Sequence, residues 1–203
     1  MRKVTQVLVL LLSCVFFYGC SATKPSNIKN ICAIFGEQED WYEHANDAYR
    51  RWGSSIPVMM SMMYQESSFN ADAKPPRTTF LWIFPGPRPT SAFGYAQALD
   101  MTWDGYLEKT GRWFADRNDF EDAIDFIGWY NNQSHKQSNI GLNDSYHLYL
   151  AYHEGHGGFN RRSFKGKSWL KAAARKVSAR SRQYQRQLKG CEHRFESGWW
   201  FFR

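Results

Sequence analysis

Metal-binding and nucleotide-binding patterns are missing from this 203-residue chain. Its four cysteines and six histidines include neither a Cys-x-x-Cys pair nor a His-x-x-x-His pair, so we expect no metal site. The glycine-rich stretch Gly155–Phe159 lacks the lysine and the serine or threonine of a phosphate-binding loop. These absences argue against metal and nucleotide binding.

The sequence shows only weak strand signals and no internal repeats, and its prolines are unevenly distributed. Five of the seven prolines lie within residues 75–90, which predicts an irregular loop or short hairpin there. Hydrophobic residues make up 43% of the chain and aromatic residues 17%, which excludes a disordered protein. The length fits one domain, and we predict a single all-α domain over residues 32–203.

Positive charge is concentrated at the carboxyl end of the chain. The formal net charge is +7, but residues 161–203 carry 13 basic and 2 acidic side chains, whereas residues 20–160 carry 11 basic and 17 acidic ones. A nucleic-acid binder that uses this basic end is one interpretation, and a solvated helix face is the other.

The amino terminus predicts export. A basic start at Arg2 and Lys3 precedes about 12 apolar residues, too few for a comfortable transmembrane span. The run ends at Gly19-Cys20-Ser21 and resembles a bacterial lipoprotein signal, which implies removal of residues 1–19, a lipid on Cys20 and a tether over residues 20–31. Ser21 favours the periplasmic face of the outer membrane over the inner membrane, and a secretory signal argues against nucleic acid as a partner. A plain secretory signal or an uncleaved anchor are the alternatives.

Two cysteines remain if Cys14 leaves with the signal and Cys20 carries lipid. An even remainder in an oxidising compartment predicts a disulfide between Cys32 and Cys191, with two unpaired thiols as the alternative. Closing so long a loop stabilises the fold by roughly 3–5 kcal/mol through chain entropy.

Apolar residues recur at three- and four-residue spacing in several stretches, which predicts helices. We expect them over residues 41–52, 57–66, 119–133, 143–152 and 168–188. The second is apolar nearly all round, so it belongs at the centre of the fold. Glu66 ends this helix, and a carboxyl group in apolar surroundings has the raised pKa that a general acid needs. The alternative is a glutamate that has already turned outward to solvent at the helix end.

Three short motifs occur in a characteristic order. They are Glu66-Ser67-Ser68-Phe69-Asn70, then Gly94-Tyr95-Ala96-Gln97, then Ala151-Tyr152-His153-Glu154-Gly155. Together they resemble the soluble lytic transglycosylase family over residues 66–160. The resemblance implies a lysozyme-like fold, no cofactor, and cleavage of the MurNAc–GlcNAc β-1,4 bond of peptidoglycan glycan strands with formation of 1,6-anhydroMurNAc.

The resemblance also implies roles for residues. Glu66 is expected to act as general acid and then general base, and Tyr152 to place its hydroxyl near Glu66. Tyr152 is also expected to bind substrate, together with Gln97, Gly94, Tyr95 and His153. The alternatives to these roles are structural: Gln97 could close a turn with its polar side chain, and Tyr152 could be an aromatic residue of the core.

Two features depart from the family pattern. His153 stands where the family carries asparagine, and the 75–90 segment lengthens the spacing between the first two motifs. With Phe80, Trp82 and Phe84, this segment is predicted either to form a wall or lid beside the glycan or to be a packed surface loop. Ser91 and Thr90 receive no role.

Two further functions stay open. A hydrolase of the same fold would need a second carboxylate, for which Asp72 and Asp100 are candidates, although each also suits a turn or a helix cap. A non-catalytic cell-wall-binding lipoprotein is the other. Endo or exo cleavage, the peptide-stem preference, protein partners and the role of the aromatic ending Trp199–Phe202 do not follow from the sequence.

Overall fold

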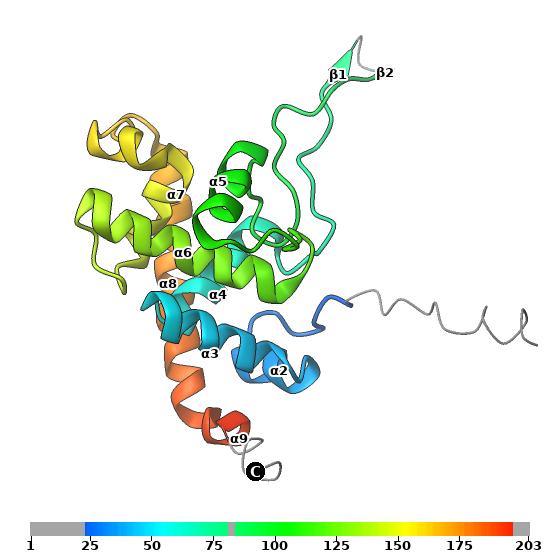
Figure 1. Ribbon diagram of the computed structural model, residues 1–203, viewed down its shortest axis with the longest axis vertical. Coiled ribbons are helices and arrows are strands. Elements are labelled where there is room, and N and C mark those ends of the chain that lie inside the picture. Colours follow the sequence, from blue (N-terminus) through cyan, green and yellow to red (C-terminus); the bar gives the residue numbers. More distant parts are fainter. Residues whose placement is uncertain (1–22, 81–83, 197–203) are drawn as a thin grey trace, which may run out of the picture.

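The computed structural model describes residues 23–80 and 84–196, and over these residues the fold is all-α, as predicted (Figure 1). One hairpin of two very short strands interrupts the helices. The elements are α2 (Ile31–Glu37), α3 (Trp41–Trp52), α4 (Ile56–Ser67), β1 (Thr79–Phe80), β2 (Phe84–Pro85), α5 (Asp100–Thr110), α6 (Phe120–Ser138), α7 (Ser145–Asn160), α8 (Ser168–Cys191) and α9 (His193–Glu196).

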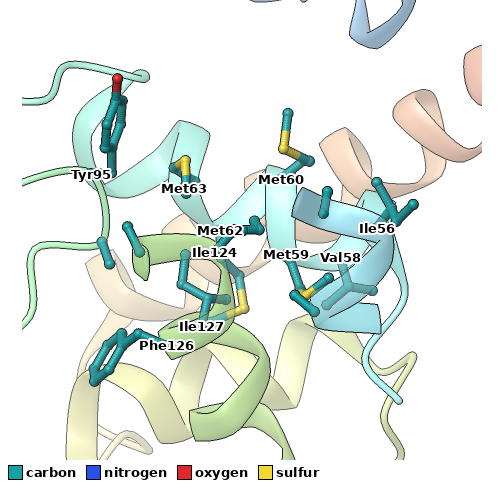
Figure 2. Close-up of a cluster of buried hydrophobic side chains, with 14 of the residues drawn as sticks. Ile56, Val58, Met59, Met60, Met62, Met63, Tyr95, Ile124, Phe126 and Ile127 are labelled. Atoms are coloured by element: carbon teal, nitrogen blue, oxygen red, sulfur yellow. The ribbon is translucent and has the colours of Figure 1, made fainter. Parts of the chain in front are cut away.

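Helix α4 occupies the centre of the fold, as its sequence predicts. Every residue from Ile56 to Met63 is buried, because α4 packs against α8, α6, α3 and α7. Figure 2 shows the methionines of α4 among the buried side chains of the core, with Met60 pointing away from Ile124 and Ile127 of α6. Pro57 lies in the first turn, where a missing N–H costs no hydrogen bond. The first two turns of α4 are thereby enclosed, and its carboxyl end, from Tyr64 to Ser67, reaches the partly exposed margin of the core.

An aromatic cluster packs the first residue of α3 against α6 and against two loops. The rings of Trp41 and Phe120 stack with centroids 3.8 Å apart, and Phe69 and Tyr95 pack against the same indole at 5.8 and 5.6 Å. Phe69 follows α4 and Tyr95 belongs to the second sequence motif, so this cluster sets the distance between the two motifs.

The long helix α8 is joined to the start of the domain. Cys32 and Cys191 form a disulfide with a Cα–Cα distance of 6.1 Å, which confirms the predicted pairing. The Gln187 amide oxygen accepts from the Ile31 backbone at 3.1 Å, and the Tyr184 hydroxyl donates to the Ile28 carbonyl. Residues 28–31 are therefore part of the packed domain, whereas the sequence assigned them to a tether.

Helix starts follow the predictions where caps are strong, whereas α6 and α7 continue to Ser138 and Asn160, beyond the predicted ends at residues 133 and 152. Asp119 and Asp144 cap α6 and α7 through their carboxylates, which accept from Asp122 and His147 backbone N–H groups at 3.1 and 3.2 Å. Helices α2, α5 and α9 were not predicted, since α2 and α9 are short and α5 buries only Trp103 and Tyr106. In the described ranges, no helix combines the length and the apolar character that crossing a membrane requires.

The 75–90 segment leaves the helical body as a two-legged loop with β1 and β2 toward its tip (Figure 1). Thr78 ties the legs together: its backbone N–H and its hydroxyl donate to the Pro87 carbonyl at 3.0 and 2.8 Å. Trp82, one of the aromatic residues of the predicted wall, lid or packed surface loop, lies outside the described residues.

Candidate active site

Glu66 lies in the last turn of α4, where the chain makes an unusual turn. Ser68 and Phe69 both have positive φ angles, 52° and 60°, a conformation that costs free energy for residues with a Cβ. The fully buried Phe69 ring, packed against Trp41 and Tyr64, holds this turn in place. The helix therefore ends abruptly just after Glu66, which fixes the position of its side chain.

Burial changes the acid–base character of Glu66. The residue is partly exposed, but its carboxyl group is enclosed, and this desolvation raises the pKa to about 7. A hydrogen bond with the Tyr149 side chain opposes the shift. The two causes together leave a carboxyl group that holds a proton up to near-neutral pH, as a general acid must.

The hydroxyl that binds Glu66 comes from Tyr149, one helical turn before the tyrosine named by the motif. Tyr152 instead donates to the Ala96 carbonyl at 2.6 Å and contributes to the site through its proximity to the charge of Glu66. The Tyr130 ring lies 5.0 Å from the Tyr152 ring. Burial raises the pKa of all three phenols, so they remain neutral hydrogen-bond donors at physiological pH.

The second motif forms a tight turn that Tyr152 joins to α7. The Gln97 amide donates to the carbonyls of Ala73 and Gly94 at 2.8 and 2.9 Å, so its nitrogen closes the turn. Gly94 has a φ of 78°, and a Cβ there would lie 1.9 Å from the Arg117 carbonyl oxygen. Only glycine fits this position, which explains the residue without any contact to substrate.

Tyr95 packs in the core. Its side chain has no exposed surface, and its ring contacts Trp41 and Phe120 at 5.6 and 5.9 Å. The motif led us to expect a contact with the glycan, but a fully buried side chain cannot make one. The turn that leaves Gln97 partly exposed directs Tyr95, two residues earlier, into the core.

His153 is held by a buried carboxylate. Glu154, whose side chain is only 3% exposed, lies 3.2 Å from His153 Nδ1 and 2.7 Å from Lys167 Nζ, and it accepts a hydrogen bond from Ser163. Burial acts to raise the pKa of Glu154, but the hydrogen bonds from Lys167, Ser163 and His153 outweigh it and the pKa is lowered. Glu154 is thus a charged anchor for the imidazole.

Trp169 presents an exposed ring beside His153. The two rings meet edge to face with centroids 4.9 Å apart, and Trp169 is 57% exposed. His153 lies four residues after Tyr149, hence on the same face of α7 one turn further along.

The antiparallel packing of α4 and α8 places Trp169 relative to Glu66. The start of α4, at Pro57, shares a cavity lining with Gln185, whereas its end, at Tyr64, lies under Arg180. Moving toward Glu66 therefore means moving toward the start of α8. Lys176 of α8 lines a cavity together with Gln65, which adjoins Glu66. Trp169 lies seven residues before Lys176, or about 10 Å further along α8, and so lies beyond the end of α4 that carries Glu66.

The candidate second carboxylates stay at the surface. Asp100 begins α5 and pairs with Arg117 at 2.7 Å, and Asp72 is exposed in the turn after Asn70. Ser91 accepts from the Asp100 backbone at 3.1 Å and so supports the start of α5. The causes of the Glu66 pKa shift include none of these groups.

Sequence reasoning missed Tyr149, Glu154 in its anchoring role, and Trp169. The spacing of Tyr149 from Tyr152 places both on neighbouring faces of one helix, which was the available signal. The expected lipid site Cys20, the signal over residues 1–19 and the ending Trp199–Phe202 lie outside the described residues.

The fold and site define a lysozyme-like helical domain in which the last turn of a buried helix carries the enclosed carboxyl group of Glu66. A family model described as Transglycosylase SLT domain matches residues 8–191, so the chain belongs to this family. Membership implies a transglycosylase enzyme that acts on peptidoglycan. A comparison with curated proteins found no match.

Proposed function

We propose that this protein is a lytic transglycosylase that cleaves the MurNAc–GlcNAc β-1,4 bond and leaves a 1,6-anhydroMurNAc end. The observation that carries the proposal is Glu66, an enclosed carboxyl group with a pKa of about 7 at the abrupt end of a buried helix. The family membership supports the substrate class.

Glu66 acts twice in the proposed reaction. Its acid form donates a proton to the glycosidic oxygen as the bond from that oxygen to C1 of MurNAc breaks. The resulting carboxylate accepts the proton of the MurNAc C6 hydroxyl while that oxygen bonds to C1, which restores the acid form. The step consumes no water, and intramolecular attack replaces a second carboxylate that would activate water.

Other residues position the reacting groups. Tyr149 holds the Glu66 carboxyl by a hydrogen bond, and Tyr152 holds the turn that carries Gln97. Since both amide hydrogens of Gln97 meet carbonyls, its amide oxygen is the atom that accepts from an N-acetyl N–H. His153 and Trp169, beyond the end of α4, contact the sugar on that side.

The decisive experiment is mass analysis of the fragments released from purified sacculi. The wild type is expected to release products one water lighter than hydrolysis gives, and Glu66→Gln to release none. Glu108→Gln is the matched control, because this carboxylate is 70% exposed on α5. A reducing MurNAc end would instead establish a hydrolase, and full activity of Glu66→Gln would remove Glu66 from the mechanism.

The proposal includes export and lipidation at Cys20, with the domain at the periplasmic face of the outer membrane. The support is the amino-terminal sequence: a basic start, an apolar run and Gly19-Cys20-Ser21. Cys20→Ser removes the site of lipidation, and cell fractionation is expected to show the variant lost from the outer-membrane fraction. Unchanged fractionation of this variant would contradict lipid anchoring.

A further inference from the structure

A basic cavity lies between α4 and α8, on a different side of α4 from Glu66. Its volume is about 430 Å³, and its lining includes Ser61, Tyr64, Gln65, Lys176, Arg180 and Gln183. None of the described residues that line it is acidic. We call it the α4–α8 cavity.

The charges in this cavity have neutral neighbours. The Arg180 guanidinium lies 4.2 Å from the centroid of the Tyr64 ring and donates to the Gln183 amide oxygen at 3.0 Å. Within residues 23–80 and 84–196, neither Arg180 nor Lys176 forms an ion pair with a carboxylate. Their charges are therefore open to a ligand, and the amides of Gln65 and Gln183 suit a peptide backbone.

We propose that the α4–α8 cavity binds the carboxylates of a peptide stem attached to the glycan strand being cut. This inference rests on the proposed function, because only peptidoglycan brings such a peptide to Glu66.

The distance between the two sites suits this ligand. Gln65 lines the cavity and adjoins Glu66 in sequence, so the two sites are separated by about one helix diameter, ~10–12 Å. An extended peptide of four residues spans ~13–14 Å, enough to pass around the end of α4. A stem that hangs from a sugar beside Glu66 therefore reaches Arg180 without leaving the surface.

The test compares glycan strands that carry peptide stems with the same strands stripped by an amidase. The double variant Lys176→Gln, Arg180→Gln removes both charges. The matched control Arg175→Gln, Arg186→Gln removes two charges from the same helix at positions outside the cavity lining. Arg180→Lys keeps the charge and is expected to keep most of the preference.

We expect the wild type to show the lower KM on peptide-bearing strands. The cavity double variant is expected to raise this KM roughly tenfold, since two partly exposed ionic contacts are lost, with less than twofold change on stripped strands. The control is expected to leave both values unchanged. Equal losses on both substrates, or no wild-type preference, would overturn the inference.

A binding measurement separates this inference from the proposed function. Calorimetry with the free stem peptide released by the amidase is expected to show binding to the wild type and to the Arg175/Arg186 control, and loss of binding in the cavity variant. Binding that survives in the cavity variant would refute the site. A wild type that binds the peptide but releases no anhydro product would refute only the proposed function.

Discussion

The Tyr149 side chain hydrogen-bonds the Glu66 carboxyl group across the packing of α7 against α4. Each residue perturbs the other: the carboxylate raises the pKa of Tyr149, and the hydrogen bond lowers that of Glu66 against the larger effect of burial. The pKa of about 7 is thus a balance between desolvation, which favours the protonated form, and one hydrogen bond, which favours the charged form.

This balance predicts the pH dependence of catalysis. The acid form of Glu66 disappears as the pH rises through about 7, so kcat/KM is expected to fall there. Tyr149→Phe removes the contact that lowers the pKa, and the basic limb is expected to move upward by roughly 0.5–1 pH units. Tyr152→Phe is the control, because its hydroxyl bonds to Ala96. A downward shift in Tyr149→Phe, or equal shifts in both variants, would contradict this assignment.

The same raised pKa predicts a pH-dependent cost to stability. Glu66 titrates at about 7 in the folded protein and near 4.5 when unfolded, so ionisation lowers the free energy of unfolding as the pH rises through this window. Glu66→Gln is expected to gain about 2–3 kcal/mol on the wild type between pH 4 and pH 8. Urea unfolding at both pH values measures the difference. Glu108→Gln should show little such gain, and a pH-independent difference for Glu66→Gln would argue against an enclosed carboxyl group.

Gly94 is expected to tolerate no side chain. Gly94→Ala places a Cβ against the Arg117 carbonyl at a φ of 78°, and we expect a loss of at least about 2 kcal/mol of stability together with activity, since the Gln97 turn must shift. Gly105→Ala is the matched control. A Cβ at Gly105, inside α5, meets nothing within 4 Å, so this variant is expected to gain ~0.5–1 kcal/mol. Thermal melts of both variants test the contrast, which similar melting temperatures would refute.

Trp169 is expected to act on substrate binding alone. Trp169→Ala should raise KM several-fold with little change in kcat, because the ring lies beyond the end of α4 rather than at the reacting bond. Its melting temperature should stay near that of the wild type, since the side chain is 57% exposed. Trp169→Phe keeps an aromatic face and is expected to recover most of the affinity. A fall in kcat at unchanged KM would place Trp169 in the chemical step instead.

Local patterns in the sequence predicted the parts of this site that depend on neighbouring residues. The nearly continuous apolar run before Glu66 predicted a central helix with a carboxyl group at its end, because a helix buried on all sides carries apolar residues at most positions. Its one polar buried residue, Ser61, donates to the Val58 carbonyl. Apolar spacing predicted helix starts near residues 119 and 143, where Asp119 and Asp144 cap α6 and α7 in the structure. The cysteine count predicted the disulfide, since the expected signal cleavage and lipidation leave Cys32 and Cys191 to pair.

The remaining features depend on how helices cross, which no local pattern encodes. The motif directed attention to Tyr152, but the rotation of α7 about its axis aims Tyr149 at Glu66 and Tyr152 at Ala96. The motif likewise included Tyr95, which the Gly94 turn sends into the core.

The sequence by itself thus determined the central helix, its terminal carboxyl group and the covalent link between the ends of the domain. Tertiary structure alone decided which hydroxyl meets that carboxyl group and which exposed aromatic ring lies beside His153. The physical reason is that periodicity specifies which face of a helix is buried, whereas partners within hydrogen-bond distance depend on the angles and offsets at which several helices pack.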